Sequence, residues 1–196
     1  MATSRVKTSS ILQGFPKSRS LLAGNTAYIP NYYQSIQTIT VGSGGLATAS
    51  FTSIPQTYKH LQIRGFFNQG GGNWINTTYN SDTSASYQWH YPYTDGSGTV
   101  PAGWSGGASQ NATVCAYNAN STQFAAFVFD ILDYTNTNKN KVGRSISGVD
   151  ANGSGIIFAP LSNLWTKTNA ITQIDLASSG TFAQYSHFAL YGIKGA

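Results

Sequence analysis

Glutamate is absent from this chain, and charged residues of every kind are scarce. Charged side chains make up only 9% of the 196 residues, and the acidic ones are six aspartates. Glutamate, lysine, leucine and alanine usually fill exposed helix faces, whereas glycine, serine, threonine, asparagine and aromatic residues fill strands and turns. Because hydrophobic residues still reach 40% and aromatic residues 13%, the composition predicts a folded all-β protein and excludes a disordered one.

Cysteine is almost absent as well. The single Cys115 excludes an intramolecular disulfide and a cysteine-based zinc site, and its apolar run ATVCAY predicts a small buried residue. The N-terminal segment lacks the continuous apolar stretch of a secretory signal, and no run reaches about 18 apolar residues. We therefore expect synthesis in the cytoplasm, no membrane partner, and a core that forms without metal or disulfide.

Positive charge is concentrated at the N-terminus. The whole chain has a formal net charge of +5, and residues 1–30 hold four cations and no acid. The cations are Arg5, Lys7, Lys17 and Arg19. Apolar residues of the same segment form short clusters, at Ile11, Leu12, Phe15, Leu21 and Leu22. This spacing suits neither an amphipathic helix nor a hairpin.

We predict that residues 1–31 form an extended basic anchoring arm and that these nine residues attach it to a partner. A solvated, unattached tail is the alternative, but apolar clusters are not expected in a tail that contacts only solvent. Four charges without interleaved aromatic residues are weak for a nucleic-acid tail, so nucleic acid is not the expected partner. The expected partner is an acidic protein surface.

Residues 32–196 alternate turn clusters with apolar or β-branched runs, which predicts a single domain of short strands. In YKHLQIRGFFN, for example, Leu61, Ile63 and Phe67 share one face while Gln62 and Arg64 share the other. The expected strands lie at 35–41, 46–54, 58–68, 74–80, 86–91, 112–117, 123–134, 143–150, 154–160, 170–178 and 185–193. The first two are predicted to pair as a hairpin. The pattern predicts a jelly-roll-like antiparallel β-sandwich.

Two polar segments, 68–73 and 92–111, are predicted to be surface loops. They carry or adjoin Trp74, Tyr93 and Trp104, whose flat faces can stack on sugar rings. The same three residues would also suit packing at a subunit interface or at the end of the sandwich. Both interpretations stay open at this point.

Motifs for catalysis or for cofactor binding are missing from the sequence. The three histidines, His60, His90 and His187, lie on strand patterns, without a GxSxG elbow or an HExxH motif. Asp130 and Asp133 differ by three positions, so on a strand they point to opposite faces and cannot act as a pair. We therefore predict no enzyme activity and no catalytic, cofactor or metal site. The run 138–141, NKNK, is interpreted as a solvated turn.

Four segments of the chain resemble a family of small virion proteins of tailed bacteriophages, many of which infect cyanobacteria or marine bacteria. They are ILQGFPKSRSLLAGN (11–25), FTSIPQTYKHLQIRG (51–65), DILDYTNTNKNK (130–141) and FAQYSHFALYGIKG (182–195). The resemblance implies a virion structural protein that is made in the host cytoplasm, with no catalytic residues. It further implies a β-sandwich that oligomerises, with a homotrimer as the expected form.

Two roles follow from this resemblance. In the first, the chain is a capsid decoration or cement protein, and its arm binds the major capsid protein. In the second, it is a tail fibre or receptor-binding module: its arm binds a tail or baseplate protein, and its loop aromatics bind host surface glycan. The chain is short and has no repeats or coiled coil to form a shaft, so the sequence favours decoration.

Overall fold

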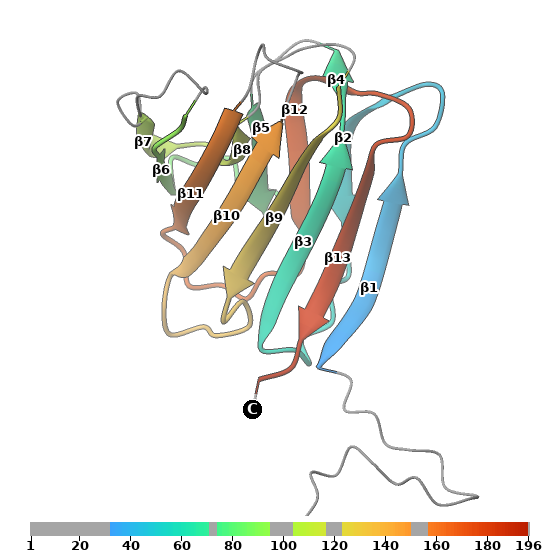
Figure 1. Ribbon diagram of the computed structural model, residues 1–196. Helices are drawn as coiled ribbons and strands as arrows, with labels where there is room; N and C mark the ends of the chain where they lie inside the picture. The colour runs from blue at the N-terminus through green and yellow to red at the C-terminus, as the bar shows by residue number, and fades with distance from the viewer. Residues whose placement is uncertain (1–31, 71–73, 95–103, 117–122, 150–156, 196) are drawn as a thin grey trace, which may run out of the picture. The chain divides into compact units, whose positions relative to one another are not determined.

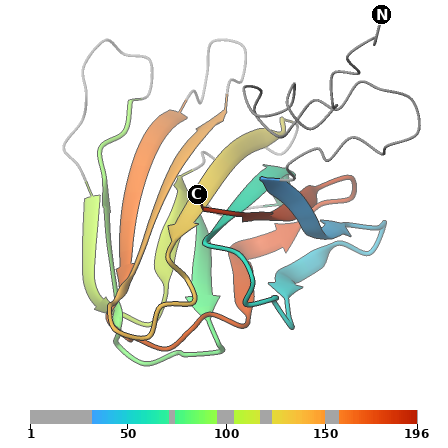
Figure 2. The same ribbon diagram turned by 90° about the horizontal axis from the view of Figure 1, so that it is seen from below.

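The computed structural model describes residues 32–70, 74–94, 104–116, 123–149 and 157–195, apart from the side chains of 104–106 and 116. Within these ranges the fold is all-β, as predicted: thirteen strands form two antiparallel sheets that pack face to face (Figures 1 and 2). The anchoring arm, residues 1–31, lies outside the described residues. Residues 33–196 form one compact unit.

The larger sheet has eight strands. In spatial order they are β1 (Tyr33–Thr40), β13 (His187–Ile193), β3 (His60–Phe67), β9 (Ala125–Leu132), β10 (Lys141–Val149), β11 (Ile157–Trp165), β6 (Tyr87–Tyr91) and β7 (Trp104–Ser109). The smaller sheet contains β2 (Leu46–Phe51), β12 (Ile174–Phe182), β5 (Trp74–Tyr79) and β8 (Ala112–Ala116), and the short β4 (Gln69–Gly70) pairs with β12.

The strand order is that of a jelly roll with additions. The four strands β1, β13, β3 and β9 lie in one sheet and β2, β12, β5 and β8 in the other, which is the double-sheet arrangement of eight strands. The remaining long strands, β10, β11, β6 and β7, all extend the larger sheet beyond β9 (Figure 1). The larger sheet is therefore much wider than a minimal jelly roll requires.

The predicted hairpin between residues 35–41 and 46–54 is wrong. Strand β1 pairs with β13 and β2 pairs with β12, so the two strands belong to different sheets. The turn itself forms, with Gly45 N–H donating to Gly42 O over 3.1 Å and Gly45 in the left-handed region at a φ of 70°. The chain thus reverses at this turn and crosses from the larger sheet, which contains β1, to the smaller sheet, which contains β2.

Two other segments differ from the sequence prediction. Strand β7 lies inside the stretch 92–111, which was predicted to be a loop, and β4 lies inside the predicted loop 68–73. Both segments are rich in glycine, which weakens the side-chain signal for a strand. The long run 123–134 is confirmed as a central strand, since β9 lies between β3 and β10.

Aromatic rings fill the space between the two sheets. Phe67 on β3 lies 5.9 Å from Phe127, 6.1 Å from Phe182 and 6.2 Å from Phe188, measured between ring centroids. Gly65 allows this packing, because a Cβ there would lie 2.1 Å from a ring carbon of Phe127. All four rings are buried, so each contributes about 1.5 to 3 kcal/mol to folding.

The loop between β9 and β10 closes around a buried lysine. The predicted solvated turn 138–141 is wrong at Lys141, which is only 1% exposed. Its ammonium group donates to the carbonyl oxygens of Asn136, Lys139 and Thr168. A buried cation is tolerated only where such acceptors replace water, so this cage fixes the base of the β9–β10 hairpin.

The turn between β5 and β6 is tied to β11 by Asp82. One of its carboxylate oxygens accepts a hydrogen bond from the indole nitrogen of Trp165 over 2.7 Å, and the carboxylate also accepts bonds from Ser84 and Ser86. Partial burial raises the pKa of Asp82, but the bonds from Ser84, Ser86 and Trp165 together bring it well below its usual range. The charged form of Asp82 therefore stabilises the fold.

We predict that Asp82→Asn destabilises the protein at neutral pH by about 1 to 3 kcal/mol, because the buried Trp165 indole loses a charged acceptor. A depressed pKa contributes stability that is present above pH 4 or so and is lost as pH falls through the lowered pKa. The difference between wild type and variant in urea unfolding should thus shrink from pH 7 to pH 3. Asp175→Asn is the matched control, and an equal loss in that variant would contradict the role of Asp82.

We also predict that Cys115 is chemically inert in the folded protein. It is fully buried, and burial raises the pKa of its thiol to about 12. Reaction with a thiol reagent at pH 8 should be at least about 100-fold slower in the native state than after unfolding in urea. Equal rates in the two states would show that the β8 region opens readily.

Candidate functional site

The larger sheet turns an apolar face away from the core. We call this surface the outer face; on β9 it consists of Ala126, Val128, Asp130 and Leu132, and on β10 of Val142, Arg144, Ile146 and Gly148. Its large hydrophobic side chains are strongly exposed: Ile146 is 57% exposed and Phe158 on β11 is 50% exposed. A soluble monomer rarely exposes contiguous apolar area of this kind, so the face is a candidate interaction surface.

The smaller sheet has no comparable surface among the described residues. Its solvent-facing positions are small or polar, and the register aligns Ser50, Asp175 and Thr78 in one row. Among the described strands, all of the large hydrophobic side chains that are strongly exposed belong to the larger sheet. They are Tyr33, Phe66, Val128, Val142, Ile146 and Phe158. The asymmetry between the two sheets indicates that one side of the domain is built for contact.

A polar row crosses the apolar face. Gln62 Nε2 donates to Asp130 Oδ1 over 2.8 Å, and Arg144 Nε lies 3.8 Å from Asp130 Oδ2. Arg64 donates through Nε to Gln62 Oε1 over 2.9 Å, and its guanidinium lies over the rings of Tyr33 and Tyr191. Asp130 and Arg64 are therefore linked through Gln62, and Asp130 also lies beside Arg144.

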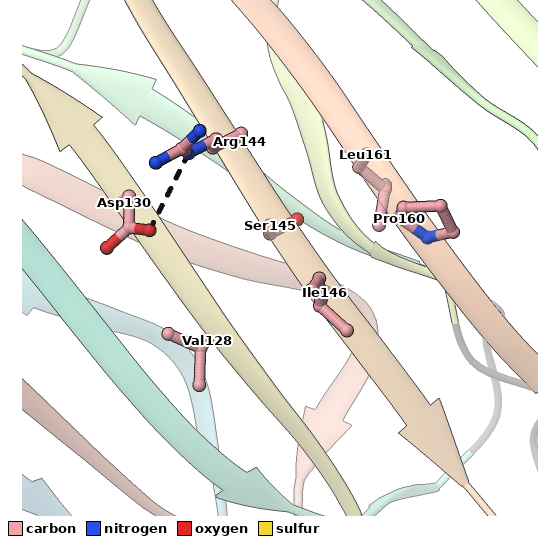
Figure 3. A pocket seen from close by; sticks show the side chains of 7 residues that line it. All are labelled: Val128, Asp130, Arg144, Ser145, Ile146, Pro160 and Leu161. Carbon is pink, nitrogen blue, oxygen red and sulfur yellow. Dashed lines mark ion pairs between the residues drawn. The ribbon is translucent and has the colours of Figure 1, made fainter.

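A hollow of about 390 Å³ lies beside the ion pair of Asp130 and Arg144 (Figure 3). Its other lining residues are Val128, Ser145, Ile146, Pro160 and Leu161. Figure 3 shows Asp130 on β9 beside Arg144 on β10, with Val128 and Ile146 next along the same two strands. A bulky apolar group from a partner would fit here with a polar group directed at the ion pair.

A second hollow of about 280 Å³ continues the surface on the other side of Pro160. It is lined by Pro92, Tyr93, Thr94, Phe158 and Pro160. Backbone hydrogen bonds of 3.0 Å in both directions between Thr94 and Phe158 hold the segment after β6 against β11. The two hollows share Pro160 and therefore lie next to each other.

Two of the three loop aromatics predicted from sequence belong to one cluster, and the third lies opposite it in the register. The buried ring of Tyr91 lies 6.0 Å from that of Trp74, 5.7 Å from Trp89 and 6.3 Å from Tyr93. Trp104 is the register partner of Tyr91 across β6 and β7, although its side chain is outside the described set. Trp74 and Tyr93 are only half buried.

The histidines do not form a catalytic group. His60 Nδ1 accepts a hydrogen bond from the backbone N–H of Asp133 over 3.0 Å, while His90 and His187 are exposed on separate strands. Lys139 and Lys59 lower the pKa of Asp133 to about 2, so this carboxyl acts as an ion-pair partner on the surface. In the described residues no cluster of three metal-ligating side chains occurs. Nor does any described segment form a helix long and apolar enough to span a bilayer.

The outer face was not predicted from the sequence, although a signal for it is present. In the run QFAAFVFDILDY the residues between the core positions are also apolar, at Ala126, Val128 and Leu132. A strand with one solvated face should alternate apolar and polar residues, so apolar residues in both phases indicate that both faces are covered. The nine arm residues predicted for attachment, from Arg5 to Leu22, lie outside the described residues.

Comparisons with models of known protein families, with curated proteins and with solved structures give no match.

Proposed function

We propose that this chain is a structural protein of a tailed-bacteriophage particle, displayed on the particle surface as a capsid decoration or cement protein. The observation that carries the proposal is the exposed apolar outer face, which suits a protein that works within an assembly. The resemblance of four sequence segments to small virion proteins supplies the setting. Synthesis in the host cytoplasm agrees with the single cysteine, since the fold does not depend on an intramolecular disulfide.

In this proposal the N-terminal arm attaches the domain to the major capsid protein. Each of Ile11, Leu12, Phe15, Leu21 and Leu22 could contribute roughly 1.5 to 3 kcal/mol when buried against a partner. Exposed ion pairs from the four cations would add at most about 1 kcal/mol each. Apolar contacts thus supply the larger share of the attachment energy, and charge guides encounter and register.

Deleting residues 1–30 should leave the domain folded while the particle fails to incorporate it. Phe15→Ala with Leu21→Ala should weaken attachment more than Arg5→Ala with Lys7→Ala, because apolar burial outweighs exposed charge. Occupancy is measured by quantifying the protein on purified particles, with circular dichroism as the control for folding. Incorporation of the truncated chain at normal occupancy would place the attachment site on the β-sandwich instead.

The position and copy number of the chain on intact particles distinguish decoration from a role in the tail. Hundreds of copies over the head would support decoration. A few dozen copies or fewer on the tail would support a tail fibre or receptor-binding module.

The aromatic cluster around Tyr91 favours this second candidate function. Trp74 and Tyr93 lie half buried at the same end of the domain, and aromatic rings with a polar edge suit stacking on sugars. In a tail protein this end of the domain would bind host surface glycan.

If the cluster binds glycan, Trp74→Ala and Trp104→Ala should reduce adsorption of particles to host cells while assembly stays intact. Tyr185→Ala is the matched control, since it removes a strongly exposed aromatic ring outside the cluster. Unchanged adsorption in both tryptophan variants would leave the cluster with a packing role only.

A further inference from the structure

We propose that the outer face of the larger sheet binds the same face of a second copy of this chain. The two-fold axis would lie midway between the two facing sheets, parallel to the strands and opposite the line between β9 and β10. This inference rests on the strand register and the exposed side chains, and it holds whether the protein is on the head or the tail.

The register determines which residues such an axis brings together. Rotation about an axis parallel to the strands keeps each residue at its height along the strand and exchanges the strands on either side. Strand β9 therefore faces β10 of the partner subunit, and β3 faces β11. Residues that are register partners across neighbouring strands form one row, and the rotation keeps each row at its own height. An outward residue on one side of the axis therefore faces, in the partner subunit, the residue of the same row on the other side.

Charge complementarity favours this arrangement. Asp130 is the one outward acid on β9, Arg144 is the one outward base on β10, and the two are register partners. Across the axis Asp130 faces Arg144 of the partner subunit, and Arg144 faces the partner's Asp130. The four groups form a square of alternating charge in which each ion gains a second partner of opposite sign.

The apolar rows on either side match in the same way. Val128 faces Ile146 of the partner subunit, and Leu132 faces the partner's Val142. Next to them the small Ala126 faces Gly148 of the partner subunit, which leaves room for close approach. At the edge of the patch Phe66 on β3 faces the partner's Phe158. Two twisted sheets pack face to face with their strands within about 30° of each other, so this contact has ordinary sheet geometry.

The alternative two-fold axis, perpendicular to the strands, is disfavoured by the same row. An axis of this kind that passes through the row of Asp130 and Arg144 places Asp130 against Asp130 and Arg144 against Arg144, and like charges at close range cost several kcal/mol. The chain's own N-terminal arm is also a poor occupant. Its four cations come without an acid, while the outer face offers Arg64 and Arg144 against the single Asp130.

The first test uses the full-length chain and two charge reversals. Asp130→Arg and Arg144→Asp each break the alternating square and should weaken self-association at least about 100-fold in sedimentation velocity. Mixing the two variants should restore association, because one subunit then presents two cations and the other two anions. Both variants also lose the ion pair within the subunit, so a role limited to folding predicts no recovery on mixing.

The second test keeps the native charges and reports the axis. A mixture of Val128→Cys and Ile146→Cys chains should be joined into a heterodimer by a short bis-maleimide linker, because these positions face each other across two sheets about 10 Å apart. A mixture of Val128→Cys and Val142→Cys is the control, since position 142 lies about 13 Å along the strand from position 146. The native Cys115 is fully buried and does not compete.

Several results would overturn the proposal. A wild-type chain that sediments as a monomer at all concentrations, or as the homotrimer that the resemblance implies, excludes the two-fold pair. Association that survives both charge reversals places the interface elsewhere. Should a charge variant fail to fold, the cysteine pairs decide, and equal cross-linking in both mixtures would count against the proposed axis.

Discussion

The contact of Phe67 with Phe127, Phe182 and Phe188 is the interaction on which the rest of the structure depends. It joins four strands, three from the larger sheet and one from the smaller, across the core. Because the core takes every second residue of β3 and β9, the alternate residues of those strands must lie on the outer face. The inner packing thus determines which side chains are available for contact with other molecules.

Sequence reasoning was most successful where one strand shows its own alternation. In β3 the buried positions Leu61, Ile63 and Phe67 and the exposed position Arg64 agree with the predicted faces. The pairing of strands is different, because a turn such as 42–45 specifies a reversal and not the sheet that receives the next strand. A jelly roll sends β1 and β2 to opposite sheets, and only contacts distant in sequence decide this.

The candidate site was only partly accessible from sequence for a related reason. Trp74 and Tyr93 were identified by residue type, and the structure adds that Tyr91 joins them into one cluster. The outer face depends instead on which strands are neighbours, since Val128 and Ile146 become adjacent only through the β9–β10 register. Lys141 shows the same limit, because its carbonyl cage includes Thr168 from a distant segment.

The strands added to the jelly roll explain why the apolar face is large enough for a contact with another molecule. A minimal jelly-roll sheet would end at β9, and its outer face would then hold only the side chains of β1, β13, β3 and β9. Strands β10 and β11 contribute Val142, Ile146 and Phe158, which are half of the large hydrophobic residues that are strongly exposed in the described strands. They also contribute Arg144, the partner of Asp130. The extension therefore supplies both the apolar area and the charge that a specific contact needs, while the polar outer side of the smaller sheet remains suited to solvent.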